Sequence, residues 1–324
     1  MSNPQDSINR LNYFDNLSPV IDRLCYAYNI GKPITFSIIE VGYEDCNVII
    51  ETSAEKYVAK IFSKERDKET IDRYVTIMNK VIDAGVNHPP LIKTADGGAV
   101  YLDNQANGIS MVLMNFIDGK TFFELDCAPS KTELNLIIEQ AAKVNMIDYH
   151  PSYLFDTWAI PNIKIVFDKV KEFIKSADSK LVEQVIEQYI KIPVNILPHC
   201  LVHGDFTKAN IIKSSNGKMY ILDFSVSNWY PRIQELAVIS ANLLHSESAS
   251  MSLREKTELV ADEYSKFNPL TQEERKYLYT YSLASAAMEF LGACQEKFIK
   301  GNNSAENDYW LNLGRNGLRI ELNN

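Results

Sequence analysis

Two neighbouring stretches decide the fold: Leu201-Val-His-Gly-Asp-Phe-Thr-Lys-Ala-Asn210 and Tyr220-Ile-Leu-Asp-Phe224. The first places His203, Asp205 and Asn210 in one polar segment, and the second has Asp223 directly after an apolar run. Carboxylates and an amide at close intervals are oxygen donors of the kind that activate a hydroxyl group and hold magnesium. A lone His-Gly-Asp is more often a turn than a site, so the interpretation depends on all four residues together.

The polar residues are set between short apolar runs. These runs stand at 200–202, 211–212 and 220–222, and Ser-Ser-Asn-Gly occupies 214–217. Such spacing predicts short buried strands, two of them joined by a tight hairpin turn at 214–217. The hairpin brings Asn210 and Asp223 to the same end, where both can reach one cation. Magnesium often takes only one or two ligands from protein, while phosphates and water supply the rest.

The intervals match those of the protein-kinase catalytic loop, His-Arg-Asp-x-x-x-x-Asn, and of the Asp-Phe-Gly that follows it. Asp205 and Asn210 are five positions apart, and Asp223 follows Asn210 by thirteen in Leu-Asp-Phe. We therefore expect Asp205 to accept or orient the attacking hydroxyl, and Asn210 and Asp223 to hold Mg²⁺ against ATP. We group His203 with the catalytic residues, but we expect it to brace the loop.

With Gly in place of the loop Arg, this segment resembles the aminoglycoside phosphotransferase and choline kinase-like superfamily of small-molecule kinases, which includes homoserine kinases. The likeness continues in 231–238, with Glu235 where the family usually has Asp, and in 111–119. It implies an α+β, bilobal, protein-kinase-like fold. The expected parts are an N-lobe with a small antiparallel β-sheet at 1–113, a hinge at 114–119 and a mainly helical C-lobe at 120–324.

The amino-terminal part is expected to bind the nucleotide. Alternating or β-branched runs at 34–41, 47–51 and 56–62 predict three antiparallel strands. Lys60, in Val-Ala-Lys-Ile, stands where kinases place the strand lysine that contacts the α- and β-phosphates. The resemblance implies that Gly42 and Asn47 lie at the two ends of a turn that covers the phosphates. A plain hairpin turn explains this segment equally well.

Two further nucleotide contacts follow from the resemblance. The backbone groups of Asn115, Phe116 and Ile117, in the hinge, are expected to meet the adenine. A helix at about 68–84, predicted from the spacing of its apolar residues, should carry an acidic partner for Lys60. Glu69 and Asp72 are the nearest candidates, and neither is fixed by a motif.

Beyond the hinge the sequence predicts helices. Ser130 and Glu133 have capping-box spacing before an apolar helical pattern. Further helical patterns stand at 165–174, 181–190, 253–267 and 272–298, with Asp178 between the first two. This first pair either helps to form the acceptor pocket or only covers the C-lobe.

Composition indicates an ordinary enzyme without targeting or membrane segments. The 324 residues are 46% hydrophobic, enough for a substantial core, and the net charge of −9 argues against nucleic acid as a partner. Five scattered cysteines lack metal spacing and predict reduced thiols in a cytoplasmic protein. The polar start and the lack of a long apolar stretch predict no membrane contact, and the oligomeric state stays open.

These features together predict an ATP-dependent phosphotransferase acting on a hydroxyl of a small molecule. The acceptor, whether homoserine, an aminoglycoside or a similar metabolite, is not chosen by the sequence, and neither is ATP over GTP. One alternative is a catalytically inactive kinase-like module that binds nucleotide or protein. A second is a hydrolase whose Asp205 and Asp223 hold metal around water, which leaves Lys60 and the hinge unexplained.

Overall fold

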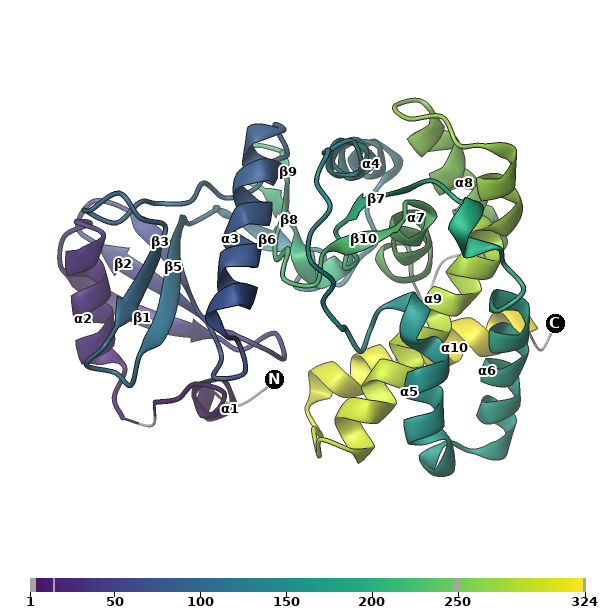
Figure 1. The fold of residues 1–324 in the computed structure, drawn as a ribbon, viewed down its shortest axis with the longest axis horizontal. Helices are drawn as coiled ribbons and strands as arrows, with labels where there is room; N and C mark the ends of the chain where they lie inside the picture. Colours follow the sequence, from purple (N-terminus) through teal and green to yellow (C-terminus); the bar gives the residue numbers. More distant parts are fainter. Residues whose placement is uncertain (1–3, 14, 247–250, 323–324) are drawn as a thin grey trace. The chain divides into compact units, whose positions relative to one another are not determined.

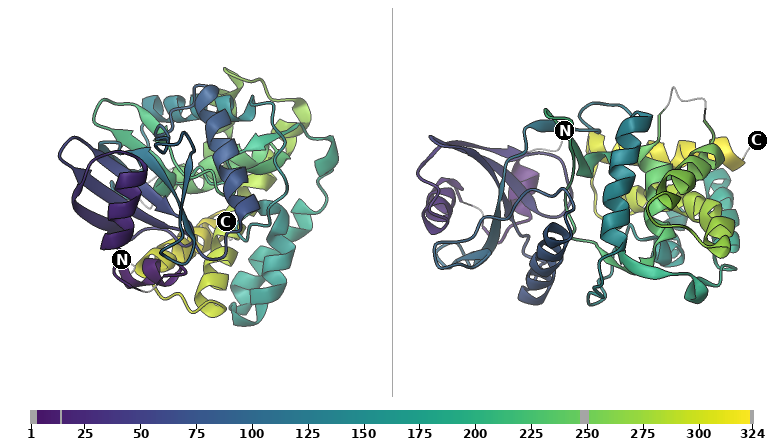
Figure 2. Two further views of the ribbon diagram at one scale, coloured as in Figure 1. Left: turned by 60° about the vertical axis from the view of Figure 1, so that its left-hand side comes forward. Right: turned by 90° about the horizontal axis from the view of Figure 1, so that it is seen from above.

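The computed structural model describes residues 4–13, 15–246 and 251–322. Its chain divides into two compact units, which we describe separately (Figures 1 and 2). Unit 1 consists of Met1–Ile82 and His88–Asp118, and unit 2 of Asp83–Asn87 and Gly119–Asn324. Both contain antiparallel strands and helices, so the chain has an α+β fold.

Unit 1 is built on one antiparallel sheet. Its five strands, in the order β1-β2-β3-β5-β4, are β1 (Pro33–Ile39), β2 (Cys46–Thr52), β3 (Lys56–Ile61), β5 (Ile109–Asn115) and β4 (Val100–Asp103). The three strands predicted from alternating residues are therefore confirmed. The short helix α1 (Pro4–Asn9) and helix α2 (Ser18–Ala27) precede the sheet, and α3 (Lys68–Asp83) follows β3.

The two faces of this sheet have different neighbours. Apolar residues of α2, including Ile21 and Leu24, share a buried cluster with alternate strand residues such as Ile50, Ala59 and Ile61. Since successive side chains of a strand point to opposite faces, Lys60 lies on the face away from this cluster. There its ammonium nitrogen lies 5.1 Å from the ring centroid of Tyr74 on α3.

Unit 2 surrounds two small sheets with helices. The sheets are β6 (Gly119–Thr121), β8 (Ile211–Ser214) and β9 (Met219–Ile221), and β7 (His199–Val202) with β10 (Asn228–Pro231). The helices are α4 (Lys131–Asn145), α5 (Ile163–Val170), α6 (Ser176–Tyr189), α7 (Ile233–Val238), α8 (Leu253–Ser265), α9 (Gln272–Phe298) and α10 (Ala305–Leu322). The long helix α9 packs against α5, α6, α7, α8 and α10.

Several local predictions for unit 2 are confirmed, and one is wrong. The hairpin of β8 and β9 turns at Gly217, whose φ of 80° favours glycine. The capping box of Ser130 and Glu133 opens α4. Asp178, expected between two helices, instead lies buried in the first turn of α6, where it accepts hydrogen bonds from Arg319 at 2.7 and 2.9 Å. The helix begins five residues before Leu181, the first apolar residue of the predicted pattern, and this polar first turn gave no apolar signal.

A buried ion pair joins the starts of α7 and α9. Arg232 donates to both carboxylate oxygens of Glu274, at 2.5 and 2.7 Å. Glu274 also accepts from the backbone amide (2.8 Å) and hydroxyl (2.9 Å) of Thr271, the N-cap of α9. The Glu274 side chain is fully buried, so its charge is balanced only by these donors.

The cysteines and the helices also bear on the sequence predictions. All five cysteines are unpaired, which confirms the prediction of free thiols; Cys25, Cys46, Cys200 and Cys294 are buried, and Cys127 is exposed. Within residues 4–13, 15–246 and 251–322, no helix has both the length and the apolar character needed to span a membrane.

Candidate active site

The carboxylate of Glu235 fixes the loop that follows β7. Glu235 of α7 accepts a hydrogen bond from the backbone amide of His203 (2.8 Å) and another from that of Gly204 (2.9 Å). Gly204 has a φ of 86°, a conformation that favours glycine and lets two successive amides point at one partner. Burial raises the pKa of the Glu235 carboxyl to about 7, against the opposing effect of these amides.

His203 connects this loop to the strand that carries Asp223. Its Nε2 hydrogen-bonds the carbonyl oxygen of Leu222 (2.7 Å), and its Nδ1 accepts from the backbone amide of Asp205 (3.0 Å). The ring lies against Phe206 and Phe224, at centroid distances of 5.0 and 4.4 Å. The side chain is fully buried, and burial lowers its pKa to about 4. A neutral, fixed imidazole of this kind has the geometry of a brace.

Asp205 and Asn210 are in direct contact. The side-chain amide of Asn210 donates to the Asp205 carboxylate at 2.6 Å and to its backbone oxygen at 3.2 Å. The backbone carbonyl oxygen of Asn210 accepts a hydrogen bond from the backbone amide of Leu222 (2.8 Å). Asn210 ends a 3₁₀ turn, Lys208–Asn210, that leads directly into β8. The loop and the β9 strand end are therefore one hydrogen-bonded assembly.

Asp223 follows β9 in a left-handed conformation. Its φ is 56°, which is uncommon for a residue other than glycine and is often found at functional sites. One carboxylate oxygen accepts from the backbone amide of Ser225 at 3.2 Å, and the residue is half-buried. Because Leu222 bonds both Asn210 and His203, Asp223 is attached to the loop through its immediate neighbour.

These residues suit a metal that is shared with phosphate. Among the residues that the structure describes, no group of three or more His, Cys, Asp or Glu side chains could hold a metal ion by itself. One carboxylate and one amide oxygen match the small number of protein ligands that magnesium takes when phosphates supply others. Asp223 and Asn210 therefore fit the metal role predicted for them, and that role stays a prediction.

One acid and one amide near this loop, Glu289 and Asn242, were not found from the sequence. The backbone amide of Lys208 donates to the Asn242 side chain (3.4 Å), which donates to Glu289 of α9 at 3.0 Å. Asn242 lies in a π-helical turn, Ile239–Leu243, of the kind often seen at functional sites. Burial raises the pKa of the half-buried Glu289 to about 8, and the charge of nearby Asp205 adds to this. Glu289 is far from the motif in sequence, so no spacing pattern could indicate it.

In unit 1, the predicted lysine forms an ion pair. The ammonium of Lys60, on β3, lies 3.1 Å from a carboxylate oxygen of Asp45, and both side chains are almost completely buried. Asn47 stands directly opposite Lys60 in the pairing of β2 with β3, so the two share a sheet face. Gly42 has a φ of 113°, and its carbonyl oxygen accepts from Arg10 at 2.7 Å.

The acidic partner of Lys60 differs from our expectation. We expected Glu69 or Asp72 of α3, but the structure pairs Lys60 with Asp45 of the turn between β1 and β2. Glu69 is exposed in the first turn of α3, and Asp72 pairs with Lys68 on the surface. The helix presents the ring of Tyr74 to Lys60 instead. A residue in a turn carries no helical periodicity, which explains why sequence spacing missed it.

The expected adenine segment follows β5. The amide of Asn115 donates to the Pro90 carbonyl and that of Phe116 to the Lys56 carbonyl, at 3.1 and 3.2 Å. These two donors are thus already used within unit 1. Ile117 is half-buried beside them.

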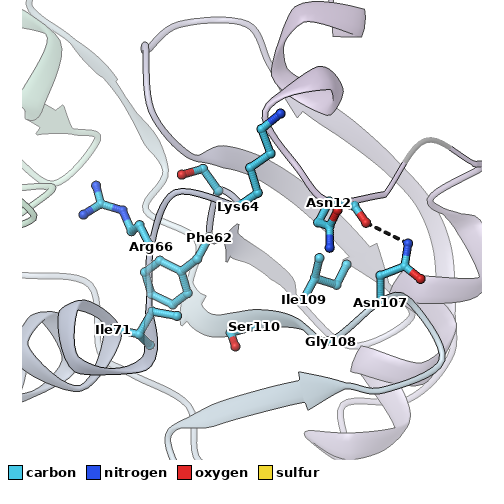
Figure 3. Close-up of a pocket in the computed structure, with 10 residues that line it drawn as sticks. Asn12, Phe62, Lys64, Arg66, Ile71, Asn107, Gly108, Ile109 and Ser110 are labelled. Atoms are coloured by element: carbon cyan, nitrogen blue, oxygen red, sulfur yellow. Dashed lines mark hydrogen bonds between the residues drawn. The ribbon is translucent and has the colours of Figure 1, made fainter.

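A small pocket of about 130 Å³ lies at the end of β3 (Figure 3). It is bounded by Asn12, whose carbonyl accepts from Asn107 at 2.9 Å, and by the residues following β3. It includes Ser63 and Arg66 but not Lys60, and Figure 3 shows Arg66 directed away from Asn107.

Three features of this chain are typical of kinase-like phosphotransferases. They are an Asp in a left-handed conformation after a short strand, a His-Gly-Asp loop bonded to an Asn, and a buried strand lysine. The chain belongs to the phosphotransferase enzyme family (APH), whose model matches residues 35–265. This match confirms the predicted superfamily and the predicted enzyme class, a phosphotransferase related to small-molecule kinases.

Individual relatives are distant. Homoserine kinase of Rhodopseudomonas palustris (strain BisA53) is 24% identical over 107 residues, which are 33% of this chain and 32% of that protein. The chain thus matches about a third of the length of this curated relative. Spectinomycin phosphotransferase, solved with ADP and spectinomycin, has a TM-score of 0.68 at 13% identity, covering 92% of this chain and 93% of its own. A microcompartment-associated aminopropanol kinase has a TM-score of 0.71 at 10% identity, with 93% and 95% covered. These likenesses establish a kinase-like α+β fold.

Proposed function

We propose that this chain transfers the γ-phosphoryl group of ATP to a hydroxyl group of a small molecule. The observation that carries the proposal is the bonded arrangement of Asp205, Asn210 and Leu222–Asp223, braced by His203. We also propose that unit 1 corresponds to the N-lobe and unit 2 to the C-lobe of a bilobal kinase, joined by the hinge at 114–119.

Asp205 is the group that receives the acceptor hydroxyl. Its carboxylate orients the hydroxyl and takes its proton as the new oxygen–phosphorus bond forms, while the bond from the γ-phosphorus to the β,γ-bridging oxygen breaks and ADP leaves. Asn210 fixes the carboxylate by donating to it at 2.6 Å, so the nucleophile is held in a defined direction. His203 is not the base in this scheme, because its pKa is about 4 and both ring nitrogens are engaged.

Asp223 and Asn210 provide the oxygen ligands for magnesium. When bound, the ion neutralises charge on the transferring phosphoryl group. The left-handed backbone of Asp223 directs its carboxylate in a way that a standard strand residue would not, which accounts for a strained conformation at this position.

The nucleotide contacts lie in unit 1. We propose that Lys60 binds the α- and β-phosphates. We also propose that the turn covering these phosphates runs from Gly42 to Asn47. Asn47 is supported by its position directly opposite Lys60. For the adenine we propose the backbone carbonyls of Asn115 and Phe116 together with Ile117, since the amides of the first two are already bonded.

The acceptor is a small hydroxyl compound such as homoserine, an aminoglycoside or a similar metabolite. Similarity to homoserine kinase and to spectinomycin phosphotransferase supports this class without selecting a member. Glu289, tied to the loop through Asn242, is our candidate for contact with the acceptor. The cytoplasmic location and the absence of a nucleic-acid partner stay predictions.

The test is transfer of labelled γ-phosphate from ATP–magnesium to pooled hydroxyl compounds. The pools contain homoserine, choline, methylthioribose, sugars, aminoglycosides and macrolides. We expect a labelled product that disappears in Asp205→Ala, while that variant keeps most of its ATP affinity. ATP affinity lost together with turnover would contradict the role of Asp205.

Two other outcomes point to different functions. ATP binding without transfer to any pool would favour a nucleotide-binding module that lacks catalysis. Metal-dependent hydrolysis without ATP binding would favour the hydrolase, since Asp205 and Asp223 would then hold metal around water.

A further inference from the structure

The carboxylate of Asp45 is the centre of a buried cluster in unit 1. One oxygen accepts from the backbone amide of Ser63 (3.0 Å) and from Nε of Arg66 (2.9 Å). The other lies 3.1 Å from both Arg66 Nε and the Lys60 ammonium. The Asp45 side chain is 1% exposed, that of Lys60 3% and that of Arg66 7%. Lys60, Arg66 and Asp45 thus meet almost entirely out of water, and the more exposed carboxylate of Glu44 pairs with Arg66 from the solvent side.

This arrangement joins three separate segments. Asp45 belongs to the turn between β1 and β2, Lys60 to β3, and Arg66 to the connection between β3 and α3. Because a buried carboxylate is strongly disfavoured without partners, the three groups hold one another in place. A lysine side chain alone is flexible, and here its ammonium is fixed by Asp45 on one side and by the ring of Tyr74 at 5.1 Å.

We propose that Asp45 is the positioning residue for the phosphate-binding lysine, and that Arg66 is a second cation of the same site. This inference rests on the proposed function, since it assigns the phosphate contacts of that site. The turn that covers the phosphates thereby supplies the acid that orients Lys60, in place of a residue of α3. Since the more exposed carboxylate of Glu44 also pairs with Arg66, two cations stand against two carboxylates, so the site offers Lys60 and Arg66 as two positioned donors for the phosphates.

The proposal predicts that removing the charge of Asp45 changes ATP affinity in the direction opposite to that expected from charge repulsion alone. Replacing Asp45 by Asn removes a negative charge near the phosphates, and by electrostatics alone this change would tighten ATP binding. If Asp45 instead acts by holding Lys60, the same change releases the ammonium and weakens binding. The sign of the effect therefore separates a positioning role from a repulsive or competing one.

The experiment is a double-mutant cycle on the full chain with Asp45→Asn and Lys60→Met. Affinity for ATP–magnesium is measured by calorimetry, and kcat and KM by phosphate transfer. We expect Asp45→Asn to weaken ATP binding at least tenfold, and the double variant to lose less affinity than the sum of the two single losses, because Asp45 acts in large part through Lys60. Asp45→Glu should recover part of the affinity. Glu65→Gln, an exposed acid in the same connection, removes the same charge and should leave binding unchanged.

Three results would overturn the proposal. These are unchanged or tighter ATP binding by Asp45→Asn, additive losses in the cycle, and a loss on Glu69→Gln that equals or exceeds the loss on Asp45→Asn. If Asp45→Asn does not fold, Arg66→Gln and Asp45→Glu replace it, and unchanged ATP affinity in both refutes the site. A wild type that binds ATP but transfers nothing refutes only the proposed function, because the cycle is read from binding. A wild type that binds no nucleotide refutes both.

Discussion

Replacing Glu235 by Gln tests whether one carboxylate holds the active-site loop. Its two oxygens accept from the amides of His203 and Gly204 at 2.8 and 2.9 Å, and the side chain is fully buried. At pH 6 a pKa of about 7 leaves this carboxyl mostly protonated, but its hydroxyl oxygen can still accept a hydrogen bond. The amino group of Gln can only donate, so it must face a backbone amide that also donates. Leaving a buried donor unsatisfied costs about 1–3 kcal/mol, and opposing two donors adds to this, so we expect a loss of about 3 kcal/mol at pH 6.

The loss is measurable in two ways. In a unit of roughly 200 residues each kcal/mol lowers Tm by about 2–4 °C, so Glu235→Gln should melt about 6–12 °C lower by calorimetry. The loop carries Asp205, so kcat should fall by about tenfold or more. Glu183→Gln, an exposed acid on α6, is the matched control. An unchanged Tm together with an unchanged kcat would refute the argument.

The same pair of proteins shows a pH effect of defined sign. Burial raises the pKa of Glu235 from its ordinary value of 4.5 to about 7, so the folded protein holds this proton more tightly than the unfolded chain. The stability from this group is present below about pH 4.5 and is lost as pH rises through about 7. The difference in unfolding free energy between wild type and Glu235→Gln should therefore shrink by about 1 kcal/mol between pH 6 and pH 8, and the difference in Tm should shrink with it. A difference that grows with pH would show that the carboxyl is ionised in the folded protein well below pH 7.

Asp223→Asn should weaken ATP binding in the presence of magnesium by about tenfold or more and change binding in EDTA little, as measured by calorimetry; equal losses in both would contradict the metal role. Glu289→Gln should raise the KM for the acceptor more than the KM for ATP, and the reverse order would remove Glu289 from the acceptor side. Glu274→Gln leaves buried Arg232 uncompensated and should cost about 3–5 kcal/mol of stability, seen as a lower Tm by circular dichroism. Glu273→Gln, whose residue makes only a surface pair at 3.5 Å, is its control.

The sequence predicted what depends on local spacing. Alternating residues located β1, β2 and β3, and Gly217 located the hairpin turn because a positive φ favours glycine. The intervals between Asp205, Asn210 and Asp223 were informative because a short loop and one hairpin join them, so sequence distance translates directly into contact.

The sequence did not predict contacts between residues that no local pattern connects. Asp45 meets Lys60 only because β2 and β3 pair in a particular register, and its turn has no repeating pattern. Glu69 was a reasonable candidate from kinase analogy, but the face that α3 turns to Lys60 carries Tyr74. Glu289 reaches Asn242 across 47 positions, a distance at which one sequence gives no signal.

The distribution of the thiols has a practical consequence. Burial raises the pKa of Cys25 to about 11, that of Cys46 and Cys294 to about 12, and that of Cys200 further, whereas Cys127 is exposed. The thiolate is the reactive form, so a maleimide dye added to the folded protein should attach at Cys127 alone. The wild-type chain thus accepts a single fluorophore in unit 2 without mutagenesis. During denaturation, the number of additional thiols that react with the dye then measures the fraction of molecules that have unfolded.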